Sequence, residues 1–173
     1  MSVLVIDVGT TGLRAALVTN HGTVEHLRYE KCAPTSPFPG LVEFDARAMA
    51  DAVLRVAREV VSLAGRIDGI GITTQRASTV MWDARTMQPL APGLGWQDLR
   101  TVGDCIVSRA EHGLVLAPNQ TATKAKWLLA NTAVDDRSAV RIGTIDSWIA
   151  AVLSDGALHV TDHSNAAVTG LFS

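Results

Sequence analysis

The first eighteen residues hold the feature that most constrains the fold, an apolar run followed by a short polar tip and a second apolar run. Residues 3–6 predict one buried strand and residues 15–18 predict another. Two strands joined by so short a connection pair in the antiparallel sense, because a parallel pairing needs a long crossover. The tip between them, residues 7–14, combines one carboxylate with glycines, threonines and an arginine: Asp7, Gly9, Thr10, Thr11, Gly12 and Arg14.

The composition of this tip indicates an anion site. Glycines let a backbone approach a ligand closely, and consecutive N–H groups in a tight turn bind anions. Threonine hydroxyls and Arg14 would add hydrogen bonds to phosphate oxygens, and Asp7 would hold Mg²⁺ through its waters. An ordinary polar hairpin turn is the alternative interpretation, since Gly and Thr are common in turns. A Walker loop does not fit, because no lysine follows and a strand comes next.

Length and composition restrict the class of protein. The 173 residues suit one domain with a real core, and the formal net charge of −2 argues against nucleic acid as the main partner. The chain has no apolar run that would cross a bilayer, and its start lacks a signal-peptide pattern. Cys32 and Cys105 lie far apart without metal-type spacing, which is typical of reduced thiols. We therefore expect a soluble, cytoplasmic protein without a membrane partner.

The pattern after the tip predicts further α/β structure. Residues 23–29 predict a third antiparallel strand, and a helix is predicted from an N-cap at Asp45 to about residue 63. Residues 67–74 predict a strand that is parallel to its neighbour, because it follows a helix. The second half predicts a strand at 79–82, helices over 100–111 and 122–129, a strand and an Asp146-capped helix within 141–149, and loop or strand around His159 and His163.

A second group of polar residues indicates a pocket for a hydroxylated ligand. Gln75 and Arg76 follow the 67–74 strand, at the carboxyl end where open α/β sheets bind ligands. Trp96 offers a flat apolar wall for a carbon skeleton, and polar neighbours such as Asp98 suit hydroxyl groups. Each of the two residues also has an alternative interpretation. Arg76 would be a surface charge, and Trp96 would be a half-buried side chain near the start of a helix that Asp98 caps.

These segments, in this order, resemble the FGGY carbohydrate kinases of the actin-like ATPase superfamily, which include glycerol kinase. The array Asp-x-Gly-Thr-Thr-x-x-Arg from Asp7 is similar to the family's first phosphate motif. The other similar segments are Pro-Gly-Leu-Val-Glu-Phe-Asp at 39–45, Gln-Arg at 75–76, Trp-x-Asp-x-Arg at 96–100, Thr-Lys-x-x-Trp-Leu at 123–128, Gly-Thr-x-Asp-x-Trp at 143–148 and Thr-Asp-x-x-Asn-Ala at 161–166. The resemblance covers essentially the whole chain.

The resemblance implies a fold and a place within a larger enzyme. The fold is a ribonuclease-H-like α/β domain, with three antiparallel strands followed by helix–strand units in a mixed sheet that is incomplete at its C-terminal end. Residues 1–173 are then one partial N-terminal domain, and the second, adenosine-binding domain is absent. We expect such a piece to self-associate through an uncovered sheet edge or domain face.

The resemblance also implies an activity, in which ATP with Mg²⁺ phosphorylates a hydroxyl of a sugar or polyol. The implied phosphate-binding residues are Asp7, Gly9, Thr10, Thr11 and Arg14, with Asp7 holding Mg²⁺ through water. The implied substrate-binding residues are Gln75, Arg76, Trp96, Asp98 and Asn119. In the family, the general-base aspartate belongs to a Gly-Asp-Gln motif. No such motif appears up to Ser173, and Asp162 is the nearest late carboxylate. We expect this chain alone to be inactive; the alternative is a non-catalytic binding or interaction module with a kinase-derived fold.

The chain departs from the glycerol kinase pattern at two positions in the implied substrate pocket. Ala77 stands where glycerol kinase has a glutamate, and Asn119, after Pro118, stands where it has a tyrosine. A pocket that lacks a hydroxyl acceptor leaves that hydroxyl unpaired, which is costly. The departures argue against a simple transfer of the glycerol contacts, and the acceptor stays open.

Overall fold

The computed structural model describes residues 1–172, which divide into two compact units. Unit 1 comprises residues 1–33 and 47–75, and unit 2 comprises residues 34–46 and the chain from Arg76 onward. No helix within residues 1–172 is long and apolar enough to cross a membrane.

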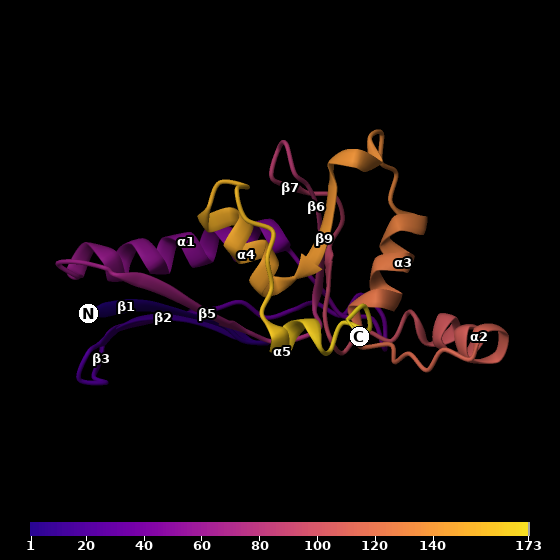
Figure 1. Cartoon of the computed structure of the whole chain (residues 1–173), viewed down its shortest axis with the longest axis horizontal. Coiled ribbons are helices and arrows are strands. Elements are labelled where there is room, and N and C mark those ends of the chain that lie inside the picture. The colour runs from indigo at the N-terminus through magenta and orange to yellow at the C-terminus, as the bar shows by residue number, and fades with distance from the viewer. Residues whose placement is uncertain (173) are drawn as a thin grey trace. The chain divides into compact units, whose positions relative to one another are not determined.

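Unit 1 is built on a four-stranded mixed sheet with the strand order β3-β2-β1-β5 (Figure 1). The strands β1 (Ser2–Val8), β2 (Gly12–Thr19) and β3 (Val24–Lys31) are antiparallel neighbours. The strand β5 (Gly69–Thr74) pairs with β1 in the parallel sense. The three antiparallel strands and the parallel strand predicted from the sequence are confirmed.

One face of this sheet is buried. The register places Leu4 opposite Leu17, Ile6 opposite Ala15 and Val8 opposite Leu13, and all six side chains are buried. The helix α1 (Ala46–Leu63) runs along the sheet (Figure 1), and it begins and ends where the sequence predicts. Its buried positions recur at helical spacing, which gives the helix one apolar face: Met49, Ala50, Val53, Val56, Ala57 and Val60.

Unit 2 contains a separate sheet made of antiparallel pairs. Its strand order is β4-β8-β6-β7, and β9 pairs with the other side of β6. The strands are β4 (Glu43–Phe44), β6 (Thr79–Asp83), β7 (Gln88–Pro89), β8 (Gly93–Leu94) and β9 (Val140–Thr144). Only β5 therefore extends the mixed sheet as a helix–strand unit. The next strand, β6, follows β5 after residues 75–78 with no helix between them, too short a connection for a parallel crossover.

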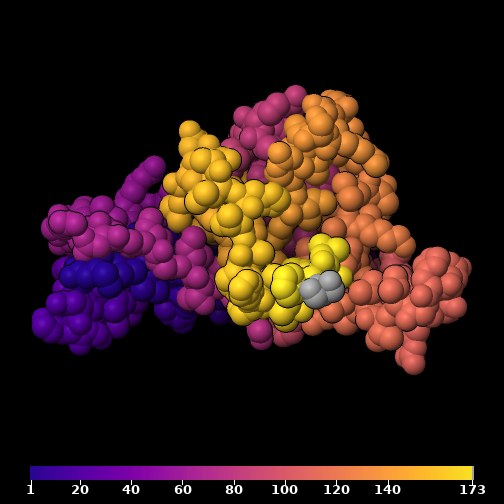
Figure 2. Space-filling view, viewed as in Figure 1, coloured from indigo at the N-terminus to yellow at the C-terminus, as the bar shows by residue number. Residues whose placement is uncertain are grey.

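The core of unit 2 forms where two helices pack on this sheet. The helices α3 (Thr121–Asn131) and α4 (Ile145–Leu153) both contact β6 and β9. Met81, Leu94 and Leu128 make a buried cluster, and the rings of Trp82 and Trp148 lie 5.4 Å apart. The helix α2 (Val102–His112) has no buried residue and stands out from the rest of unit 2 (Figure 2).

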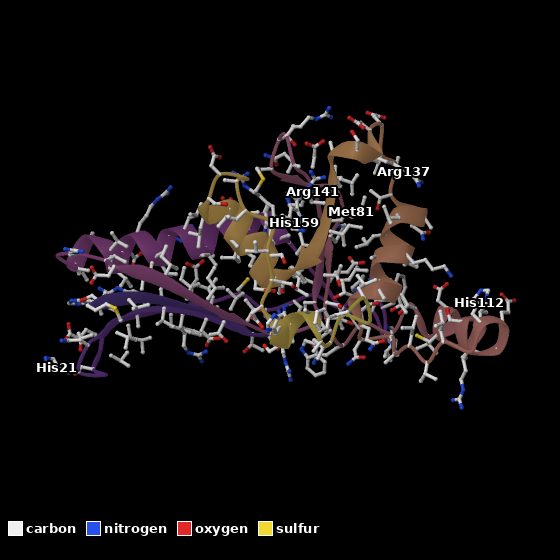
Figure 3. The ribbon with its side chains drawn as sticks, in the orientation of Figure 1. His21, Met81, His112, Arg137, Arg141 and His159 are labelled. Carbon is white, nitrogen blue, oxygen red and sulfur yellow. The ribbon has the colours of Figure 1, made fainter. Side chains whose placement is uncertain are left out.

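Two local predictions for unit 2 were wrong. Asp146 does not cap α4, since the helix begins at Ile145 after Thr144, and the Asp146 carboxylate accepts a hydrogen bond from Thr161 at 2.7 Å. His163 opens the short helix α5 (His163–Ala166), where loop or strand was predicted. His159 does lie in an irregular segment, against the ring of Trp82 and within 3.2 Å of the Ile142 carbonyl oxygen (Figure 3).

The buried face of α1 yields a matched test. Val60 is fully buried and its neighbour Val61 is 42% exposed. We expect Val60→Ala to lower the free energy of unfolding by about 2 kcal/mol, because two methyl groups leave a packed site. Val61→Ala should change it by less than about 0.5 kcal/mol. Urea unfolding of both variants checks this, and equal losses would contradict the packing of α1.

Candidate functional site

The structure gathers the predicted phosphate-binding residues in one turn of unit 1. The register places Asp7 of β1 opposite Arg14 of β2, and Arg14 Nη1 lies 3.2 Å from Asp7 Oδ2. Between them, the Gly9 N–H donates to the Gly12 carbonyl oxygen at 3.0 Å and closes the turn. The turn is held to its neighbours because the Cys32 N–H donates to the Thr11 carbonyl oxygen at 3.1 Å. Gly9, Thr10 and Thr11 therefore lie at an ordered tip.

The ring of Tyr29 packs closely over Gly12. A Cβ atom on Gly12 would lie 2.6 Å from the Tyr29 hydroxyl oxygen, so a side chain there would displace the exposed tyrosine ring. A Cβ on Gly9 would lie 3.1 Å from the Gly12 carbonyl oxygen, which is also tight. Neither glycine has a positive φ, so backbone conformation does not select glycine at these two positions. The ring of Tyr29 also lies 5.3 Å from the Arg14 guanidinium carbon, on β3 beside the turn.

The charges of the turn are accessible to a ligand. The side chains of Asp7 and Arg14 are 38% and 51% exposed, and an exposed ion pair contributes at most about 1 kcal/mol. Breaking this ion pair, so that Arg14 contacts a bound anion or Asp7 a bound cation, would therefore cost little free energy. Within residues 1–172 there is no cluster of three or more His, Cys, Asp or Glu side chains that would hold a metal ion. A metal at Asp7 would thus take most of its ligands from water or from a bound molecule, as Mg²⁺ commonly does.

The predicted substrate residues lie on either side of the boundary between the units. Gln75 is the last residue of unit 1, and Arg76 is the first of this part of unit 2. Within unit 2, the Trp96 N–H donates to the Ser78 hydroxyl oxygen at 3.0 Å, which ties the segment of Trp96 to that of Arg76. Ser78 is fully buried, whereas Trp96 is 40% exposed and Arg76 is exposed. The structure therefore brings Arg76 and Trp96 onto adjoining segments.

Ala77 has a left-handed backbone that the sequence pattern did not predict. Its φ is +65° and its side chain is buried, a conformation that costs a non-glycine residue about 1–2 kcal/mol. Its carbonyl oxygen accepts hydrogen bonds from Lys124 Nζ at 3.1 Å and Thr79 Oγ1 at 3.3 Å. The turn that carries Arg76 is therefore strained and held by its hydrogen bonds.

Asp98 is buried inside a network of hydrogen bonds. Its side chain is fully buried and accepts from the Val42 N–H at 2.6 Å and from Arg100 Nε and Nη2, each at 2.8 Å. Arg100 also bonds Glu43 at 2.8 Å and stacks over Trp127. Burial raises the pKa of Asp98, but the hydrogen bonds from Arg100 and Val42 outweigh it and hold the pKa below its usual value. Asp98 thus orients the segment around Trp96, and it does not cap α2, whose N-cap is Thr101.

Lys124 also belongs to this network, although the sequence analysis assigned it no role in the site. The residue is fully buried in α3, and Nζ donates to the carbonyl oxygens of Ala77 at 3.1 Å and Asn119 at 3.0 Å. Burial lowers the pKa of Lys124 to about 8. A signal was present in the sequence, because Lys124 shares the helical spacing of the buried residues Thr121 and Leu128.

Asp162, the nearest late carboxylate, is occupied as a helix cap. Its Oδ1 accepts from the backbone N–H groups of Ser164 at 2.6 Å and Asn165 at 3.0 Å, and its Oδ2 accepts from Asn165 Nδ2 at 2.9 Å. Hydrogen bonds from Ser164 and Asn165 lower the pKa of Asp162 to about 2. A carboxylate with so low a pKa is a weak general base at neutral pH.

The network around Asp98 yields a stability test. We expect Arg100→Met to lower the free energy of unfolding by about 3–5 kcal/mol, because it leaves the buried carboxylate of Asp98 without its cation. The matched control, Arg109→Met, changes an exposed arginine of α2 and should cost less than about 0.5 kcal/mol. Chemical unfolding monitored by tryptophan fluorescence measures both, and a near-neutral Arg100→Met would disprove the role assigned to this pair.

The sequence matches a known family along its length. Residues 2–173 match the N-terminal domain of the FGGY family of carbohydrate kinases. A glycerol kinase of Trichlorobacter lovleyi is 42% identical over 99% of this chain and 38% of its own length. A glycerol kinase of Janthinobacterium sp. is also 42% identical, over 99% of this chain and 37% of its own length. The chain thus spans about two fifths of the length of these relatives.

Solved structures of kinases share the fold. A Plasmodium falciparum glycerol kinase solved with ADP matches with a TM-score of 0.89 at 23% identity, over 98% of this chain and 37% of that protein. A xylulose kinase of Rhodospirillum rubrum matches with a TM-score of 0.83 at 23% identity, over 100% of this chain and 38% of that protein. These likenesses confirm the actin-like ATPase fold predicted from the sequence.

Proposed function

Because this chain belongs to the FGGY family of carbohydrate kinases, we propose that the whole protein transfers the γ-phosphoryl group of ATP to a hydroxyl of a sugar or polyol. The observation that carries the proposal is the turn between β1 and β2, which presents Asp7, Arg14 and the backbone of residues 9–11 together in a chain that matches the family over its length. Phosphoryl transfer asks a protein mainly for positioning and for neutralisation of charge, and these groups supply both.

In this proposal the turn binds the phosphates of the nucleotide. Gly9, Thr10 and Thr11 would offer N–H and hydroxyl donors to phosphate oxygens, and Arg14 would exchange its exposed pairing with Asp7 for a charge-assisted bond to phosphate. Asp7, thus released, would hold Mg²⁺ through water. The ion, when bound, neutralises negative charge on the phosphates.

The acceptor would bind near Arg76 and Trp96. The half-exposed ring of Trp96 suits the carbon skeleton of a sugar or polyol, and Gln75, Arg76 and Asn119 suit its hydroxyl groups. Asp98 would contribute indirectly, by holding Arg100 in position, because its own carboxylate oxygens are buried and accept hydrogen bonds from protein donors. With Ala77 in place of a carboxylate, the pocket offers fewer acceptors than the glycerol kinase pattern implies, so the substrate is left at the level of its class.

We expect the 173-residue chain on its own to be inactive in transfer. The three carboxylates of interest are all committed elsewhere: Asp7 to the phosphate turn, Asp98 to Arg100 and Asp162 to the cap of α5. We therefore expect none of the three to remove the proton of an acceptor hydroxyl. The same observation favours the alternative, a binding module without catalysis, if the whole protein also lacks a base.

The test is ADP release with Mg²⁺-ATP across a panel of polyols, pentuloses and hexoses, by the protein expressed from its complete coding sequence. We expect turnover with at least one acceptor, and Asp7→Ala should lower it by on the order of 100-fold, because the Mg²⁺ that would compensate the phosphate charge loses the carboxylate that holds it. Asp51→Ala, an exposed carboxylate on α1, is the matched control and should leave turnover unchanged.

Two outcomes would contradict these expectations. An absence of turnover with every acceptor would refute the kinase proposal and leave the binding module. Turnover by the 173-residue chain itself would show that a base lies within these residues.

We place the protein in the cytoplasm, where ATP is available and thiols stay reduced. Within residues 1–172 no disulfide joins Cys32 and Cys105, which suits a reducing compartment. Measured localisation of the tagged protein decides this point.

We also propose that the 173-residue chain self-associates. In unit 1 the outer strands β3 and β5 end the sheet, and exposed strand edges recruit partners. In unit 2 the helix α2 exposes Val102, Ile106 and Val107. Analytical ultracentrifugation at tens of micromolar should therefore give a species larger than the monomer, and a monodisperse monomer would contradict this expectation.

A further inference from the structure

An apolar side chain at the position of Lys124 would cost less free energy to bury than a lysine. It is fully buried, and none of the ion pairs within residues 1–172 includes it. Burying an ammonium group without a carboxylate partner costs several kcal/mol, whereas a methionine would fill a similar volume without that penalty. The lysine therefore contributes something that packing does not, namely its N–H donors.

The two carbonyl oxygens that accept hydrogen bonds from Lys124 show what this residue contributes. The carbonyl of Ala77 lies next to Arg76, and the carbonyl of Asn119 lies 42 residues further along the chain, in a different loop. Both oxygens are within 3.1 Å of the same nitrogen atom, so one ammonium group joins the two loops. The Ala77 carbonyl belongs to the strained left-handed residue, which a strong donor helps to hold in place.

We propose that Lys124 is a positioning residue of the acceptor pocket, whose ammonium group fixes the spacing between the loop that carries Arg76 and the loop that carries Asn119. The loop of Trp96 is held in the same arrangement, because the Trp96 N–H donates to Ser78, one residue after Ala77. The identification of this region as an acceptor pocket rests on the proposed function, and the joining of the loops does not. A misplacement of about 1 Å in groups that orient a substrate can cost on the order of 100-fold.

The closing experiment compares Lys124→Met with Lys126→Met in the 173-residue chain. Lys126 lies on the same helix but is 63% exposed and paired with Asp104, so it is a control for charge and for helix propensity. Three properties are measured: the thermal midpoint, the amide hydrogen exchange of residues 76–78, 117, 119 and 120, and the dissociation constants for glycerol, xylitol, D-xylulose and ADP.

We expect Lys124→Met to accelerate exchange in both loops by at least about tenfold, since each carbonyl loses its hydrogen bond from the ammonium group. Any of the polyols or the ketose that binds the wild-type chain should bind the variant at least about tenfold more weakly. ADP binding should not change, which separates a lost pocket geometry from general unfolding. Lys126→Met should match the wild type in all three properties.

The outcomes separate the two proposals. If no polyol or ketose binds the wild-type chain, the proposed acceptor site fails, while the exchange rates still decide whether Lys124 joins the loops. If Lys124→Met lowers the thermal midpoint but leaves loop exchange and affinities unchanged, Lys124 is only a packing residue and the inference is wrong.

A measurement on the wild-type chain covers the case in which Lys124→Met does not fold. The charged groups that face Lys124 are Asp98 and Arg100, which keep their charges across neutral and mildly alkaline pH. Exchange of the two loops, corrected for its intrinsic pH dependence, should therefore rise with a midpoint near pH 8, as the ammonium loses its proton. Loop exchange that is independent of pH between 6.5 and 9 would overturn the inference.

Discussion

The burial of alternate residues of β1 is the constraint on which the rest of unit 1 depends. Leu4, Ile6 and Val8 are buried on one face, and side chains alternate along a strand, so Asp7 must point to the other face. Because β1 is paired on both sides, by β2 and by β5, this alternation cannot slip without exposing the core. The position of the one carboxylate in the turn between β1 and β2 is thus decided by hydrophobic burial and not by polar contacts.

Unit 2 is organised in a different way, around charges taken out of water. Asp98 and Lys124 are both fully buried, and each has one backbone partner in a segment distant in the sequence: the Val42 N–H for Asp98 and the Ala77 carbonyl for Lys124. Such groups add little to the free energy of unfolding, because the cost of removing a charge from water offsets the free energy gained from its hydrogen bonds. They do specify geometry, since a buried charge tolerates few alternative arrangements of its partners. The two units thus illustrate two ways in which a sequence fixes the position of a functional side chain.

Local patterns predicted what depends on local spacing. The three antiparallel strands, the bounds of α1 and the gathering of Asp7 and Arg14 in one turn follow from alternation, helical spacing and the length of the tip. The separate sheet of unit 2, the left-handed Ala77 and the joining of two loops by Lys124 were not predicted. The pairing of β6 with β9 and the hydrogen bond from Lys124 to Ala77 link segments tens of residues apart, and such contacts leave no period in the sequence. The roles of the predicted site residues in binding remain predictions.

The division into units has a consequence for the order of folding. The chain passes from one unit to the other after residues 33, 46 and 75, so each unit is assembled from two separate stretches. During synthesis unit 1 has its last strand only after residues 34–46 of unit 2 have already been made. No single cut at these crossings releases both units intact: a cut after residue 33 divides unit 1, a cut after residue 75 divides unit 2, and a cut after residue 46 divides both.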